Sequence, residues 1–96
     1  MVDVKGSAKT GMTVTVLYFA ALRERIGRET QELAIPPEGL VVSALLARLG
    51  AADARAASAL AEEPRLRVAV NHALCAMDDL VRPGDEVAVF PPMTGG

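Results

Sequence analysis

The sequence has 96 residues, of which 51% are hydrophobic and 23% charged, a length that supports one hydrophobic core without room for a second. The formal net charge is −2, and the ten basic residues are scattered rather than gathered into the basic stripe that nucleic-acid binding requires. Charged residues, glycine or proline interrupt every apolar run well before the roughly 20 residues of a membrane span, so we expect one globular domain with no nucleic-acid and no membrane partner.

Three segments are expected along the chain. Residues 1–11 carry glycines and charges without apolar periodicity, which predicts a disordered N-terminal extension. Residues 12–90 hold all the strand and helix patterns and form the predicted domain. Residues 91–96 follow the last strand as a flexible tail that closes with two glycines.

The domain begins with a strand and a short helix. Residues 13–20 (TVTVLYFA) are rich in β-branched and aromatic residues, and their alternation predicts a strand with Tyr18 on one face and Phe19 on the other. The helix formers of residues 21–26 are followed by Gly27, which suits the left-handed position after a helix. We therefore predict a short first helix over residues 21–26.

The middle of the domain contains an edge strand and two helices. Residues 29–35 alternate weakly and stop at a Pro-Pro pair, which predicts an edge strand. Apolar residues recur every three or four positions over residues 41–49, and Gly50 follows them, so we predict the main helix there with Gly50 at its end. Residues 51–63 are alanine-rich with a thin apolar stripe, which predicts a second, more exposed helix ending before Pro64.

Three strands complete the predicted order. Residues 66–71 and 74–77 indicate a hairpin turning at Asn71, a residue that tolerates tight turns. Pro and Gly at the centre of residues 82–85 predict a type II turn before the strand of residues 86–90. Helices covering one face of a mixed sheet give a two-layer α+β domain.

The sequence offers little for metal or cofactor chemistry. One cysteine, Cys75, cannot form an internal disulfide, and with one histidine, His72, no zinc site of three or four His and Cys ligands can be built. No glycine-rich phosphate-binding motif is present. We expect no metal and no cofactor bound by the chain itself, and we expect a cytoplasmic protein because no signal-peptide pattern opens the sequence.

The informative feature is the end of the sequence. The strand of residues 86–90 runs into Phe-Pro-Pro and closes with Gly95 and Gly96. Together with VTVLYFAALRERIG near the start and VAVN in the middle, the ending RPGDEVAVFPPMTGG resembles the ubiquitin-like β-grasp family of sulfur carriers, and among them the small subunits of molybdopterin synthase. The resemblance covers residues 12–96 and implies a mixed five-stranded β-grasp sheet with the helices packed on one face.

The resemblance also implies a chemistry for the tail. A C-terminal carboxylate is ionised at neutral pH and must be activated before a nucleophile can attack it. In this family an ATP-dependent, ubiquitin-activating-like adenylyltransferase adenylates the position matched by Gly96, and a sulfur donor protein converts it to a thiocarboxylate. The large synthase subunit then holds this end against a cyclic pterin precursor. Gly95 is expected to let the tail pass through narrow channels, and the resemblance implies that the chain is a protein-bound sulfur donor rather than an autonomous enzyme.

A partner-binding surface is expected where the tail leaves the domain. In a β-grasp sheet the first and last strands are parallel neighbours, so Phe19 and Phe90 should lie side by side and point away from the helices. Leu74 matches a further apolar contact position of the family. The remaining expected contacts with the large subunit belong to the tail: Pro91, Pro92, Met93 and Thr94. An apolar patch at the root of a reactive tail suits a protein interface.

Two other functions remain open from the sequence. The chain could carry sulfur for thiamine or cysteine biosynthesis, or it could be a ubiquitin-like modifier whose Gly96 is joined to lysines. Phe-Pro-Pro before Thr-Gly-Gly favours the molybdopterin synthase subunit over both.

Overall fold

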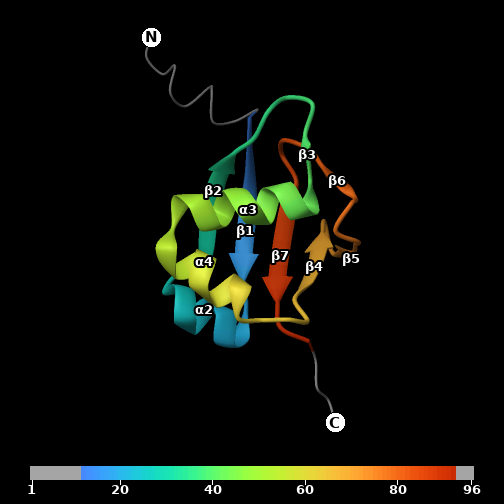
Figure 1. Cartoon of the computed structure of the whole chain (residues 1–96). Coiled ribbons are helices and arrows are strands. Elements are labelled where there is room, and N and C mark those ends of the chain that lie inside the picture. The colour runs from blue at the N-terminus through green and yellow to red at the C-terminus, as the bar shows by residue number, and fades with distance from the viewer. Residues whose placement is uncertain (1–11, 93–96) are drawn as a thin grey trace.

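The computed structural model describes residues 12–92 of the chain. Its secondary structure, in chain order, comprises β1 (Thr13–Tyr18), α2 (Ala20–Ile26), β2 (Thr30–Ala34), β3 (Leu40–Val41), α3 (Val42–Ala52), α4 (Ala54–Ala61), β4 (Arg67–Val70), β5 (Ala73–Leu74), β6 (Leu80–Val81) and β7 (Glu86–Phe90). The helices lie on one face of the main sheet (Figure 1). The predicted two-layer α+β architecture is confirmed.

The main sheet has five strands in the order β2-β1-β7-β4-β5, and β3 pairs with β6 in a separate two-stranded sheet. β1 and β7 are parallel, whereas β1–β2, β4–β7 and β4–β5 are antiparallel. The parallel register places Val16 opposite Val87 and Tyr18 opposite Val89. The sheet is therefore mixed, as predicted, and β2 lies at its edge.

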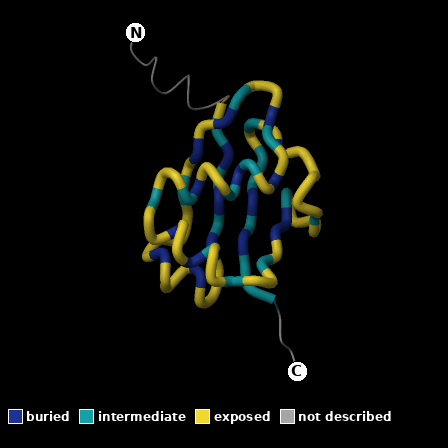
Figure 2. Tube along the Cα trace, viewed as in Figure 1, coloured by how far each residue is buried: buried dark blue, intermediate teal, exposed yellow. Residues whose placement is uncertain are grey.

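The core lies between the sheet and the helices. Every second residue of β1 and of β7 is buried, and these residues face the helices. The buried apolar residues of the strands and helices form one cluster, whose largest fully buried members are Tyr18, Leu45, Leu49, Val14, Val16, Val42, Val68, Val81, Val87 and Val89. Figure 2 shows buried segments along the central strands and exposed ones around the periphery. None of the helices within residues 12–92 is both long and apolar enough to cross a bilayer.

The prediction that Gly50 ends the main helix is wrong. Helix α3 continues through Gly50 to Ala52, and Asp53 separates it from α4. A Cβ at Gly50 would lie 3.3 Å from both Cα and Cβ of Ala57, so the glycine permits close approach of α3 and α4. The actual break comes from Asp53, whose side chain accepts a hydrogen bond from the backbone N–H of Arg55 and caps α4.

The predicted turns are present, but one strand is shorter than expected. Asn71 and His72 both adopt positive φ, 50° and 75°, between β4 and β5. Gly84 has φ of 93°, and Asp85 N–H donates to the carbonyl of residue 82 at 3.1 Å, as a type II turn requires. The strand predicted over residues 74–77 is only Ala73–Leu74.

A turn over residues 76–79 explains the shortening. The backbone N–H of Ala76 donates to the Asp79 carboxylate, and that of Asp79 donates to the carbonyl of Ala76. Residues 77 and 79 in turn accept hydrogen bonds from the first backbone N–H groups of α3. Residues 76–79 therefore stabilise the start of the main helix. The next strand, β6, pairs with β3, and this two-stranded sheet was not predicted from the sequence.

Tyr18 brings a polar group into the core. The residue is 1% exposed, and its hydroxyl donates a 3.0 Å hydrogen bond to Oε1 of Gln31 on β2. Burial raises the pKa of Tyr18 to about 12, the negative charge of Asp53 adds to this rise, and Arg28 opposes it. The buried tyrosine is therefore held in its neutral form.

Tyr18 predicts a loss of stability at alkaline pH. It is the only tyrosine and the chain has no tryptophan, so tyrosinate absorbance reports this side chain alone. The unfolded chain releases the tyrosine proton near the ordinary value of 10.0, whereas the folded protein releases it near 12. The free energy of unfolding should therefore fall by roughly 2–3 kcal/mol between pH 10 and 12. Tyr18→Phe should remove this part of the fall, and an unfolding free energy with the same pH dependence in both proteins would contradict the assignment.

Candidate functional site: the outer face and the root of the tail

The face of the sheet opposite the helices carries a row of apolar residues. In the strand register Leu17 lies opposite Ala88, Ala88 opposite Ala69, and Ala69 opposite Leu74. Leu17 and Ala88 alternate with buried residues that face the helices, and residues paired across neighbouring strands share a face, so the four form one line across β1, β7, β4 and β5 on the outer face. We call this line the outer row. It ends at Leu74, whose side chain is 62% exposed.

Phe19 lies at the end of β1, beside the outer row. It is 44% exposed, and its backbone is held on both sides: its N–H donates to the carbonyl of Val89, and its carbonyl accepts from Leu22 and Arg23 in α2. Ala20 follows with φ of 55°, a left-handed conformation that turns the chain from strand into helix. The exposed side chain of Phe19 therefore extends from a backbone that these hydrogen bonds hold in place.

Phe90 is the last residue of β7 and lies at the same end of the sheet. The register pairs Tyr18 with Val89, so Phe19 and Phe90 each follow the last paired residues of two parallel neighbouring strands. Phe90 is half-buried and lies opposite Arg67 of β4. The structure thus brings the two predicted aromatics together, and Leu74 joins the same face through the outer row.

The tail starts from this end of the sheet. Pro91 and Pro92 directly follow Phe90 and are both half-buried. We call Phe90, Pro91 and Pro92 the tail root. The other predicted site residues, Met93, Thr94, Gly95 and Gly96, lie outside the residues that the structure describes.

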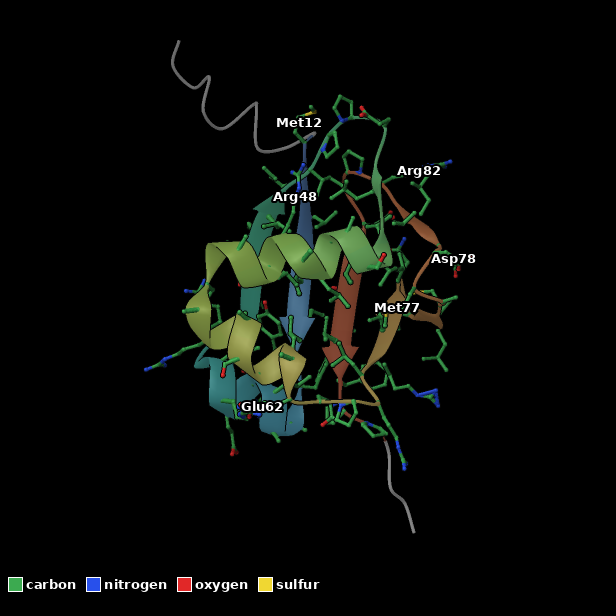
Figure 3. The ribbon with its side chains drawn as sticks, viewed as in Figure 1. Met12, Arg48, Glu62, Met77, Asp78 and Arg82 are labelled. Carbon is green, nitrogen blue, oxygen red and sulfur yellow. The ribbon has the colours of Figure 1, made fainter. Side chains whose placement is uncertain are left out.

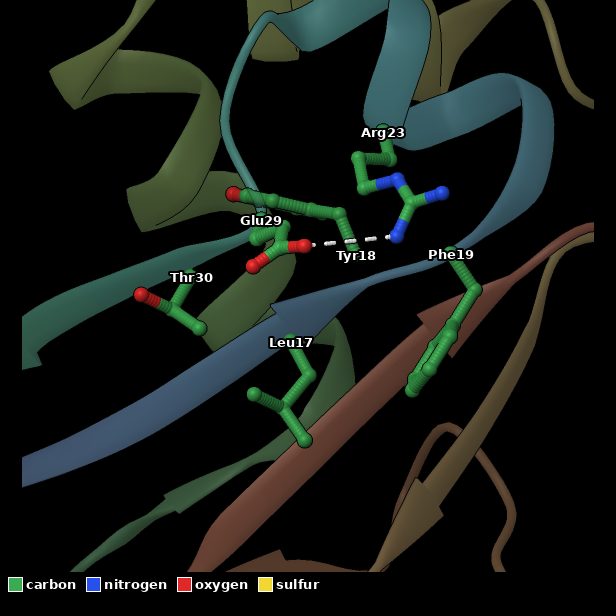
Figure 4. Close-up of a pocket in the computed structure, with 6 residues that line it drawn as sticks. All are labelled: Leu17, Tyr18, Phe19, Arg23, Glu29 and Thr30. Carbon is green, nitrogen blue, oxygen red and sulfur yellow. Dashed lines mark hydrogen bonds and ion pairs between the residues drawn. The ribbon is translucent and has the colours of Figure 1, made fainter.

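A hollow of about 230 Å³ lies beside Phe19 (Figure 4). Leu17 and Phe19 extend to one side of β1, and Arg23 reaches across to Glu29 at 3.5 Å. The hollow is lined by Leu17, Tyr18, Phe19, Arg23, Glu29 and Thr30. Leu17 and Phe19 give the hollow its apolar wall, and the Arg23–Glu29 pair gives it its charged groups.

Cys75 is next to Leu74 but is not arranged as a nucleophile. Its thiol is half-buried and donates to the carbonyl of Val68 at 3.4 Å. Burial raises the pKa of the Cys75 thiol, and the carboxylate of Asp79 raises it further, so the thiolate is disfavoured. Within residues 12–92 no cluster of three or more His, Cys, Asp or Glu side chains could hold a metal ion.

Several features of this face were not predicted from the sequence. Ala69, Ala88 and Leu17 form the outer row only through strand register, and Arg67 lies beside Phe90 for the same reason. Ala20 gives no signal of its positive φ, because alanine is common in ordinary helices. A search for alternating strands could have assigned these residues to the outer face, but not to neighbouring positions on it.

The fold and this site define the class of protein. A mixed five-stranded sheet with its first and last strands in parallel at the centre, crossed on one face by helices, is the ubiquitin-like β-grasp fold. The features that stand out within residues 12–92 are the apolar outer row and the tail root beside it.

Comparison with known proteins gives the family. The model of the ThiS family matches residues 16–96, and the chain belongs to this family. It is 42% identical over 83 residues to the molybdopterin synthase sulfur carrier subunit of Escherichia coli, covering 86% of this chain and 99% of that one. The Haemophilus influenzae protein of the same name is 37% identical with the same coverage.

A solved structure agrees with the fold. The small archaeal modifier protein 1 of H. volcanii superposes with a TM-score of 0.72 at 26% identity, covering 85% of this chain and 99% of that one. The predicted β-grasp fold and the predicted family are therefore confirmed.

The outer face should contribute little to folding. Leu74→Ser removes an exposed side chain and should change the free energy of unfolding by less than about 0.5 kcal/mol. Leu45→Ala is the contrasting variant, because Leu45 is fully buried and its truncation should cost about 2–5 kcal/mol. Denaturant unfolding of both variants measures this difference. Equal losses in the two variants would show that Leu74 belongs to the core.

Proposed function

We propose that this protein is the sulfur carrier subunit of a molybdopterin synthase. The observation that carries the proposal is its similarity to two proteins of that name, each covered over 99% of its length. The Phe-Pro-Pro and Gly-Gly residues of the ending lie within the region matched by the family. Sulfur would be carried as a thiocarboxylate on Gly96 and delivered to a cyclic pterin precursor during synthesis of the molybdenum cofactor.

The chemistry at Gly96 proceeds in two steps. A carboxylate oxygen attacks the α-phosphorus of ATP on a ubiquitin-activating-like enzyme, pyrophosphate leaves, and an acyl-adenylate forms. Hydrosulfide supplied by a donor protein then attacks the acyl carbon, the bond to AMP breaks, and loss of the sulfur-bound proton leaves the thiocarboxylate. ATP is a substrate of the activating enzyme, and this chain contributes the carboxylate and its delivery.

The role of the domain is to deliver that carboxylate to its partners. Ordering a flexible residue costs about 1–2 kcal/mol, so threading the tail into an active site must be offset by contacts elsewhere. Phe19, Leu74 and the tail root supply an apolar surface next to the start of the tail. We propose that the large synthase subunit binds this surface and that residues 91–94 complete the contact.

The second candidate function is that of a ubiquitin-like protein modifier. The similarity to the small archaeal modifier protein supports it, because the same activated Gly96 carbonyl could be attacked by a lysine amine. The product would be an isopeptide bond and AMP instead of a thiocarboxylate. Sulfur delivery to thiamine or cysteine synthesis shares the thiocarboxylate and differs only in its acceptor.

Intact-mass analysis tests the identity of the sulfur acceptor. Incubation with ATP, an activating enzyme and a sulfide source should replace one oxygen by one sulfur on the C-terminal peptide. The variant Cys75→Ala should behave like the unchanged protein, because its thiol is not the acceptor. Sulfur on Cys75 would contradict the proposal, and Gly96 joined to lysine as the only product would favour the modifier.

Truncation of Phe90 tests the docking surface. Phe90→Ala should weaken binding to a molybdopterin synthase large subunit by about 30-fold, since a central interface aromatic contributes on the order of 2 kcal/mol. Leu80→Ala is the matched control, because Leu80 is 45% exposed but lies on β6, outside the main sheet. Titration calorimetry measures both affinities, and thermal unfolding checks that both variants fold. Normal binding by Phe90→Ala would rule out this surface.

A further inference from the structure

Charged side chains lie at both ends of the outer face. At the end where β1 begins, Glu32 of β2 and Glu86 of β7 present carboxylates. Both carboxylates already have partners within the fold. Glu32 accepts hydrogen bonds from the hydroxyls of Thr13 and Thr15, at 3.1 and 2.8 Å, and Glu86 lies 3.2 Å from Nε2 of His72.

The opposite end of the same face carries positive charge. Arg67 lies directly across from Phe90, and Arg23 lies next to Phe19. Arg23 has a partner in Glu29. The guanidinium of Arg67 is exposed and has no hydrogen bond or ion pair to any side chain or backbone group within residues 12–92.

Three arginines on the helix side have partners within the fold. On the helix side, Arg25 pairs with Glu62 and Arg28 with Asp53, and Arg48 donates to the carbonyl of Ala34. These side chains connect elements of the fold. Arg67, like Arg82, connects no elements within the described residues, but Arg67 lies on the outer face directly across from Phe90.

The surroundings of Arg67 suit an interface. A guanidinium presents a rigid fork of donors that matches a carboxylate, and its stem can lie along an apolar surface. Arginine next to an aromatic anchor is enriched at binding surfaces, where charge fixes the orientation of the partner. Arg67 lies across from Phe90 of the tail root and two residues along β4 from Ala69 of the outer row, at the place where orientation decides whether the tail enters the partner.

We propose that Arg67 is a specificity-determining residue that pairs with a carboxylate of the large synthase subunit. The pair sets which end of the outer face meets the partner's active site, so that the tail root and not the Glu86 end faces the entrance. The proposal rests on the proposed function and deepens it. It predicts an acidic side chain on the partner opposite Arg67 and an apolar one opposite the outer row.

Charge reversal tests this pair. Arg67→Glu should weaken binding to the large subunit about tenfold or more, chiefly by slower association, and Arg67→Met should weaken it a few-fold while keeping the apolar stem. The defect of Arg67→Glu should shrink as salt rises from about 0.05 to about 0.5 M, because the repulsion is screened. Association and dissociation rates from a biosensor give these values, and thermal unfolding confirms that each variant folds.

The matched control is Arg82→Glu. Arg82 is exposed, its side chain has no partner within residues 12–92, and it lies at the end of the molecule opposite the tail root (Figure 3). Arg82→Glu changes the net charge by the same amount as Arg67→Glu and should bind nearly as tightly as the unchanged protein. Equal weakening by Arg67→Glu and Arg82→Glu would show only a general charge effect and would overturn the proposal.

Binding by Phe90→Ala distinguishes a failure of the Arg67 proposal from a failure of the proposed docking surface. If Phe90→Ala weakens binding and both Arg67 variants bind normally, the docking surface stands and the role of Arg67 is wrong. If Phe90→Ala also binds normally, the proposed surface itself fails. Strong salt-dependent loss at Arg67 together with loss at Phe90 supports both.

Discussion

The parallel pairing of β1 with β7 is the constraint on which the rest of this structure depends. It joins the first strand of the domain to the last and places both next to each other at the centre of the sheet. Parallel strands end at the same edge, so this single pairing carries Phe19 and Phe90 to one end of the domain. The backbone N–H of Phe19, bonded to the carbonyl of Val89, extends the pairing to the point where the tail leaves.

The two faces of this strand pair have separate roles. Side chains that face the helices, such as Val16 and Val89, are fully buried and stabilise the domain. Side chains on the other face remain partly exposed and form the outer row with β4 and β5. Because alternate residues of a strand serve opposite faces, the outer face can vary without loss of the core.

Local sequence patterns predicted much of the fold. The alternation of residues 13–18, the Asn71 turn and the Pro-Gly turn before β7 were recognised because each depends on neighbouring residues only. Gly50 was misread as a helix end. Its local signal is the same whether a glycine ends a helix or admits another helix, and only the position of Ala57 distinguishes the two. The pairing of β3 with β6 was missed because two residues are too few to show a period.

The sequence by itself determined the class of fold and the family resemblance, because these follow from residue types and their spacing. Only the tertiary structure decided which residues are neighbours on the outer face. Leu17, Ala88, Ala69 and Leu74 come from four strands, and Arg67 reaches Phe90 only through the register of β4 with β7. Register is set by how the buried side chains pack against the helices, and a shift of one residue would move each outer residue to the core.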